Sequence, residues 1–164
     1  MLVVIFRVSD MRYAIPCERI IEVIPLVVLR AEPRAPAWVL GSFVYRGALT
    51  PVLDLCQLLG GYACPKLLSS RIILTDCTLP DGSSIKAGLL AEHVTEARRL
   101  NAAPLSGASL GAAPYLGTVW QEGGNLLQIV HADRILLGSE AASTELFSHG
   151  SLTAGETDRT ATQP

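Results

Sequence analysis

The sequence consists of short apolar or alternating segments separated by turn residues, with almost no long stretch of apolar residues at helical spacing. Short segments of this kind, bounded by turn residues, are typical of β-strands. We therefore predict an all-β protein, with strands at residues 2–8, 12–16, 21–24, 38–45, 49–55, 71–77, 84–91, 93–98, 115–121 and 126–131. Short helical turns are expected at residues 17–20, 55–59 and 132–137.

Glycine, proline and aspartate mark the connections between these segments. Pro80-Asp81-Gly82-Ser83 and Glu122-Gly123-Gly124-Asn125 have the residues that tight hairpin turns require. Residues 32–37 contain two prolines, which disfavour helix in the residues before them, so this segment is expected to be a loop.

Two parts of the chain repeat the same order of features. Leu40-Gly41 opens a strand that is followed by a hairpin, an apolar strand and a short apolar helix ending at Gly60, and Leu116-Gly117 opens a similar series ending at Gly138. A curled sheet of this size is too small to bury a core by itself. The repeat therefore predicts two similar, interleaved β lobes sharing a core within residues 1–138, the second lobe at roughly 66–115.

Composition and charge exclude several classes of protein. With 49% hydrophobic residues, the 164-residue chain can bury a core, but its apolar runs are far below the roughly 20 residues that cross a bilayer. The N-terminus shows no basic leader, so we expect a cytoplasmic protein without direct membrane insertion. The net charge of −2 leaves no basic stripe for nucleic acid. Residues 139–164 are expected to form a disordered acidic tail.

The sequence shows no local arrangement typical of catalysis or of a cofactor site. Its four cysteines lack the close-paired spacing of zinc or redox sites and are interpreted as small buried thiols. His93 and His131 lie in strand-like segments, and no glycine-rich phosphate loop is found. We therefore predict no catalytic, metal-binding or cofactor-binding residues, and interpret Asp54 and Glu22 as hydrogen-bond acceptors.

The segment 41–55 resembles the signature of CheW-like domains, in which a strand glycine leads to Asn-x-Arg-Gly and then to Pro-Val-x-Asp-Leu. The residues that match in type and spacing are Gly41, Arg46, Gly47, Pro51, Val52, Asp54 and Leu55. The order of the flanking segments is also similar, and the resemblance covers residues 2 to about 138. Val44 replaces the asparagine of the signature, and Cys56 and His131 are further departures. Tyr45 beside Arg46 resembles coupling proteins of alternative chemosensory systems.

The resemblance implies two five-stranded SH3-like barrel lobes around a common hydrophobic core, and a non-catalytic adaptor recruited to membrane receptor arrays. Its implied partners are the cytoplasmic tip of a methyl-accepting chemoreceptor and the regulatory domain of a CheA-type histidine kinase. Carried over by position, the candidate receptor-binding residues are Ile20, Glu22, Gly41, Arg46 and Val94. A helix packed in a groove needs apolar anchors with a few polar partners, which this set supplies.

Three alternatives remain open from the sequence. The first is a detached regulatory domain of a CheA-like kinase, and the second is a small cysteine hydrolase that uses Cys17 or Cys56 with His93. The third is a general β-barrel scaffold with unrelated partners. Rapid, pH-dependent alkylation of one cysteine would favour the hydrolase.

Overall fold

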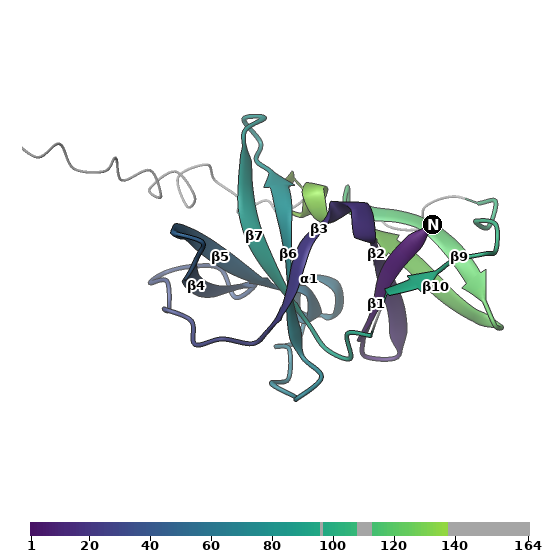
Figure 1. The fold of residues 1–164 in the computed structure, drawn as a ribbon, viewed down its shortest axis with the longest axis horizontal. Helices are drawn as coiled ribbons and strands as arrows, with labels where there is room; N and C mark the ends of the chain where they lie inside the picture. The colour runs from purple at the N-terminus through teal and green to yellow at the C-terminus, as the bar shows by residue number, and fades with distance from the viewer. Residues whose placement is uncertain (96, 108–112, 138–164) are drawn as a thin grey trace, which may run out of the picture.

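Two five-stranded sheets make up this protein, whose computed structural model describes residues 1–95, 97–107 and 113–137 (Figure 1). The first sheet has the order β8-β1-β2-β10-β9, with β1 (Leu2–Val8), β2 (Met11–Pro16), β8 (Ala97–Arg99), β9 (Leu116–Glu122) and β10 (Asn125–Val130). The second has the order β3-β6-β7-β5-β4, with β3 (Ile20–Pro25), β4 (Val39–Tyr45), β5 (Ala48–Asp54), β6 (Arg71–Thr78) and β7 (Ser84–Ala91). The predicted all-β fold of two five-stranded units is confirmed.

The second sheet is inserted into the chain between strands of the first. Its strands run from residue 20 to residue 91. Strand β3 pairs with β6, and the β4–β5 hairpin pairs through β5 with β7, whereas β1 and β2 pair with β8 and β10. The predicted acidic tail, residues 139–164, lies outside the described residues.

The sequence repeat corresponds to a structural repeat. In the second sheet, β4 and β5 form a hairpin followed by helix α1 (Leu55–Gly60), and in the first sheet β9 and β10 form a hairpin followed by the 3-10 helix η2 (Ala132–Leu137). The second strand of each hairpin then pairs in parallel with another strand, β5 with β7 and β10 with β2. A further 3-10 turn, η1 (Cys17–Arg19), connects β2 to β3.

The main hydrophobic core is built from both sheets. Phe6 and Ile15 of the first sheet belong to the same buried cluster as Leu53, Ile73 and Leu89 of the second. Strand β1 is buried on both faces, since Val3 and Ile5 belong to a smaller cluster within the first sheet. Helix η2 packs against β6, and α1 packs against β1 and β7, so short helices fill the junction between the sheets. The prediction of lobes that share a core is confirmed.

Two histidines lie outside the strands predicted for them. The segment after β7 does not continue as a strand through residues 93–98, because His93 has a left-handed backbone with φ 49° and only Ala97–Arg99 pairs with β1. Strand β10 ends at Val130, before His131, whose N–H donates to the Tyr115 carbonyl. A tight turn in the first case and the start of η2 in the second end the extended backbone.

Candidate functional site

The hairpin between β4 and β5 turns at Arg46 and Gly47. Tyr45 pairs with Ala48, and the two residues between them have positive φ values of 48° and 79°. Positive φ at both central residues is the pattern of a type I′ turn, whose twist matches that of the flanking strands. Glycine accepts this conformation without cost, whereas arginine does not, so the turn holds Arg46 in a conformation that is uncommon for its type.

The side chain of Arg46 lies over Tyr45 and beside Glu22. Its guanidinium carbon is 5.1 Å from the centre of the Tyr45 ring, and Nη2 is 3.5 Å from Oε2 of Glu22. The Tyr45 hydroxyl donates a hydrogen bond of 2.6 Å to the same carboxylate oxygen. This hydrogen bond raises the pKa of Tyr45, while the Arg46 charge acts to lower it. The side chain of Arg46 is 74% exposed, so most of its donors face solvent.

These contacts join the two edges of the second sheet. Strands β3 and β4 are the outermost strands of the order β3-β6-β7-β5-β4, and Glu22 lies on β3 while Tyr45 ends β4. The sheet is therefore curled enough for side chains of its first and last strands to meet. The interpretation of Glu22 as a hydrogen-bond acceptor is confirmed. The sequence did not reveal that Tyr45 donates to Glu22. Strand alternation indicates that Tyr45 and Val44 face opposite sides of β4, but it does not identify the partner across the sheet.

We call Glu22, Tyr45 and Arg46 the tip cluster. Val44 and Leu49 pair across the same hairpin and are 69% and 51% exposed, and strand alternation places them on the opposite face of the hairpin from Tyr45. On β3, Ile20 lies two residues before Glu22, with a register shift of the β3–β6 pairing between them, and packs partly against the core. The structure thus brings Glu22 and Arg46 into contact, and Ile20 lies near Glu22 in the same strand.

Gly41 has a structural role in β4. It is buried with φ 144°, and a β-carbon placed there would overlap the carbonyl oxygen of Arg30. The neighbouring residue, Ser42, exchanges two backbone hydrogen bonds with Arg30, of 2.8 and 2.9 Å. Gly41 therefore allows the loop before β4 to lie directly on the strand, so its contribution to any binding surface comes through backbone shape.

Val94 lies at the other end of β3 from Ile20. Its N–H donates to the carbonyl of Ser69 over 3.3 Å. Ser69 lies two residues before Arg71, and Arg71 pairs with Pro25, the last residue of β3. Strand β3 is six residues long, and each residue adds about 3.3 Å. The structure therefore does not bring Val94 into contact with the tip cluster.

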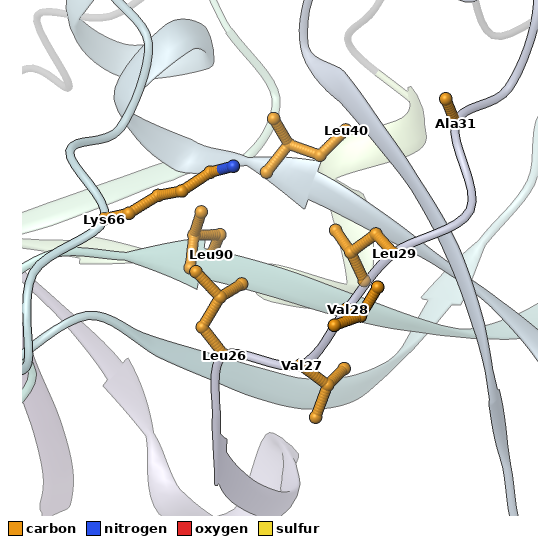
Figure 2. Close-up of a pocket in the computed structure, with 8 residues that line it drawn as sticks. All are labelled: Leu26, Val27, Val28, Leu29, Ala31, Leu40, Lys66 and Leu90. Carbon is orange, nitrogen blue, oxygen red and sulfur yellow. The ribbon is translucent and has the colours of Figure 1, made fainter.

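An apolar cavity of about 460 Å³ lies near the same end of the second sheet as Val94 (Figure 2). The side chains around it in Figure 2 are aliphatic except for one lysine; they are Leu26, Val27, Val28, Leu29, Ala31, Leu40, Lys66 and Leu90. Leu40 precedes Gly41, and Lys66 lies in the loop that leads to Ser69. The cavity thus lies next to the chain segments of two predicted site residues, Gly41 and Val94. Its lining offers no pair of groups for acid–base chemistry.

A second polar group is buried at the start of α1. Asp54 accepts the N–H of Gln57 through Oδ1 (3.0 Å) and the N–H of Cys64 through Oδ2 (2.9 Å), which confirms its interpretation as a hydrogen-bond acceptor. Within the described residues, Asp54, Cys56 and Cys64 form the one group of three potential metal ligands, with their donor atoms within 4.8 Å of one another. Seven residues lie between the two cysteines in sequence, which is not a spacing that marks such a group.

Among the described residues, no histidine belongs to this group. His93 is beside Ser69, with Nδ1 3.5 Å from the serine hydroxyl, and burial lowers the pKa of His131 near Arg134. Burial raises the pKa of the Cys17 thiol. The structure therefore does not support a hydrolase in which Cys17 or Cys56 acts with His93. Such an enzyme needs the histidine within hydrogen-bond reach of the thiol, and the contact described for His93 is with Ser69.

The sequence and the fold of this chain are similar to those of known proteins. Protein FrzA of Myxococcus xanthus is 33% identical over 123 residues, which cover 73% of this chain and 74% of FrzA. The crystal structure of the scaffolding protein TtCheW from Thermoanaerobacter tengcongensis has a TM-score of 0.64 at 22% identity, covering 79% of this chain and 82% of that one. Residues 2–140 match the family described as the CheW-like domain. By this match and by its two-sheet fold, the chain belongs to the CheW-like domain family.

Proposed function

We propose that this protein is a non-catalytic adaptor that couples a methyl-accepting chemoreceptor to a CheA-type histidine kinase. The observation that carries the proposal is the match to the CheW-like domain over residues 2–140, almost the whole of the described fold. One of the related proteins, TtCheW, is a scaffolding protein. Within the described residues, the cavity is lined by aliphatic side chains and one lysine, and the group formed by Asp54, Cys56 and Cys64 contains no histidine.

The proposed receptor contact is centred on the tip cluster. Arg46 is held at a fixed position by the turn, by the Tyr45 ring and by Glu22, and it keeps exposed N–H groups for a carboxylate or carbonyl of the partner. Val44 and Leu49 provide exposed apolar area on the other face of the same hairpin, and Ile20 is a half-buried apolar side chain on β3. A helical receptor tip can be bound by such apolar anchors around one ordered cation.

Gly41 and Val94 enter the proposal in different ways. Gly41 shapes the backbone under the loop that lines the cavity, and Val94 forms a second contact region at the far end of β3. A receptor that reaches from the tip cluster to Val94 would run along the length of β3. We expect the kinase regulatory domain to bind a separate surface, so that one adaptor holds both partners at once.

The proposal includes a location. The structure contains, within residues 1–95, 97–107 and 113–137, no helix with the length and apolar character that spanning a bilayer requires. An adaptor of this kind would act in the cytoplasm and reach the membrane through its receptor. Recruitment to receptor arrays would therefore be lost together with receptor binding.

A bridging assay tests the function. The full-length protein is mixed with a receptor cytoplasmic fragment and a CheA-type kinase from the same organism, and sedimentation measures how much kinase is carried down with the receptor. We expect kinase recruitment to depend on the adaptor. Absence of binding to both partners would contradict the coupling function and leave a general β scaffold.

Variants of Arg46 test the receptor surface. Arg46→Asn keeps a residue that tolerates the left-handed turn, and it removes the cation, so it should fold normally and bind the receptor about tenfold more weakly. Arg46→Glu, which reverses the charge beside Glu22, should bind more weakly still. Arg99→Glu, an exposed arginine on β8 of the other sheet, is the matched control. Unchanged receptor affinity in both Arg46 variants would remove Arg46 from the contact.

A further inference from the structure

Two of the four cysteines lie close together, Cys56 in the first turn of α1 and Cys64 in the loop after it. Cys56 is fully buried and Cys64 is 7% exposed, and their sulfur atoms lie within 4.8 Å of each other. Asp54 ends β5 at the opposite end from the Arg46-Gly47 turn, and its carboxylate joins the same group. The pair is therefore separate from the proposed receptor contact.

The backbone around the two thiols is fixed by one carboxylate. Asp54 Oδ1 accepts the N–H of Gln57 in the first turn of α1, and Oδ2 accepts the N–H of Cys64 as the chain returns. Each carboxylate oxygen thus has a backbone partner, and Asp54 serves to hold Cys56 and Cys64 opposite each other. The two thiols remain as the reactive groups of the site.

The environments of the two thiols differ. The proximity of Cys64 lowers the pKa of Cys56, while burial opposes this effect. The proximity of Cys56 and burial both raise the pKa of Cys64. The Cys64 thiol donates to the Pro65 carbonyl over 3.9 Å, and its sulfur lies within 4.8 Å of the Cys56 sulfur. A thiolate next to a second thiol is the arrangement in which oxidation proceeds to a disulfide.

We propose that Cys56 and Cys64 are a modification site at which a small peroxide forms a reversible intramolecular disulfide. The Cys56 sulfur attacks one peroxide oxygen, the O–O bond breaks, and hydroxide leaves, giving a sulfenic acid. The Cys64 sulfur then attacks the Cys56 sulfur, the S–O bond breaks, and the hydroxyl leaves as water with the Cys64 proton. Two thiols and hydrogen peroxide thus give one disulfide and two water molecules, and a dithiol reductant restores the thiols.

The disulfide would lock the segment that lies between the two sheets. Helix α1 packs against β1 and β7, and in the loop after it Tyr62 accepts the N–H of Ser9 and donates to Glu92. These contacts connect the loop to the β1–β2 turn and to the end of β7. Shortening the sulfur separation to about 2 Å draws the loop toward α1, so oxidation acts on the junction of the sheets.

The other two cysteines are internal controls. Cys77 is as deeply buried as Cys56, but its thiol donates to the Ala132 carbonyl over 3.3 Å and its pKa is raised to about 12 by burial. Cys17 is half-buried, and burial raises the pKa of its thiol. Neither belongs to the Asp54 group, so neither should enter an intramolecular disulfide.

The experiment uses the full-length protein in its native state. Hydrogen peroxide is added, free thiols are then blocked with an alkylating agent, and peptide mapping by mass spectrometry identifies linked cysteines. We expect a Cys56–Cys64 linkage with a mass loss of about 2 Da, with Cys17 and Cys77 still alkylated, and full reversal by dithiothreitol. In Cys64→Ala, Cys56 should instead be labelled by a sulfenic-acid probe. Linkage of any other pair, linkage between chains, or recovery of both thiols unoxidised in the wild-type protein would overturn the proposal.

Discussion

The hydroxyl of Tyr45 donates a hydrogen bond of 2.6 Å to a carboxylate oxygen of Glu22, and this bond connects the first and last strands of the second sheet. The same oxygen is 3.5 Å from the Arg46 guanidinium. Glu22 therefore orients both residues of the β4–β5 hairpin that belong to the tip cluster. The surface proposed for the receptor depends on how the sheet is curled as well as on Arg46 itself.

The Tyr45–Glu22 bond should be visible in the titration of Tyr45. Because the carboxylate accepts the hydroxyl proton, it raises the pKa of Tyr45, and Glu22→Gln should move this pKa back toward its ordinary value. Ultraviolet titration of the phenol groups measures the change, and subtraction of the Tyr45→Phe curve assigns it among the tyrosines. Identical Tyr45 titration in the wild-type protein and in Glu22→Gln would show that the bond is absent in solution.

Alanine at Gly41 should destabilise the protein more than alanine at Gly47. Both glycines have positive φ, but a β-carbon at Gly41 would overlap the Arg30 carbonyl oxygen, whereas at Gly47 it meets nothing within 4 Å. We expect Gly47→Ala to cost about 1 kcal/mol from backbone strain, and Gly41→Ala about 2–4 kcal/mol in the free energy of unfolding. Urea denaturation measures both. Equal costs would mean that the loop at Arg30 moves freely away from β4.

Removal of the Asp54 carboxylate should destabilise α1 and the loop that follows it. Asp54→Ala leaves the N–H groups of Gln57 and Cys64 without their acceptor in a buried region, so we expect a loss of about 2–4 kcal/mol. Asp81 accepts the Ser83 N–H in an exposed turn, and Asp81→Ala, the control, should lose much less. Thermal denaturation compares the two. A small effect at Asp54 would contradict its role as the acceptor for both segments.

His131 should make the protein less stable as pH falls below neutrality. Burial lowers the pKa of His131 from its ordinary value of 6.5, with a further contribution from the Arg134 charge. The unfolded chain therefore binds this proton at higher pH than the folded chain does. The free energy of unfolding should decrease as pH falls through about 6.5 and level off below the folded-state pKa.

Replacement of His131 tests the assignment. The decrease between about pH 7.5 and 5.5 should be smaller in His131→Gln than in the wild-type protein, as measured by urea denaturation at each pH. The same pH dependence in His131→Gln as in the wild-type protein would assign the effect to another group.

Local patterns predicted the strands well, because each depends on residues that are neighbours in sequence. The strand at 84–91 and the helix after Asp54 form where alternation, turn residues and a terminal glycine indicated them. The pairing of strands that are far apart in the sequence was not predicted. The parallel pairs β5–β7 and β2–β10 join strands whose sequences carry no mark of their partner, so the division of the sheets could not be derived from alternation.

The candidate site was predicted residue by residue, and its spatial grouping was not. Nothing in the sequence shows that Glu22 meets Tyr45 across the sheet, or that Val94 lies at the other end of β3. The closeness of Cys56 and Cys64 depends on the turn of the chain at Gly61, a backbone geometry that eight-residue spacing does not encode. Burial of single residues follows from pattern, whereas contacts between distant residues follow from packing.

The insertion of one sheet within the other also has a consequence for how the protein is made. Arg12 of β2 pairs with Leu127 of β10, so the β1–β2 hairpin leaves the ribosome long before its partner strand exists. The second sheet is complete once Ala91 has emerged, and it then offers the waiting hairpin the apolar side chains of the common core. Contacts of such large sequence separation slow folding, and an unpaired strand edge favours aggregation. The yield of folded protein at high expression levels should therefore depend on how soon β10 has been synthesised and can pair with β2.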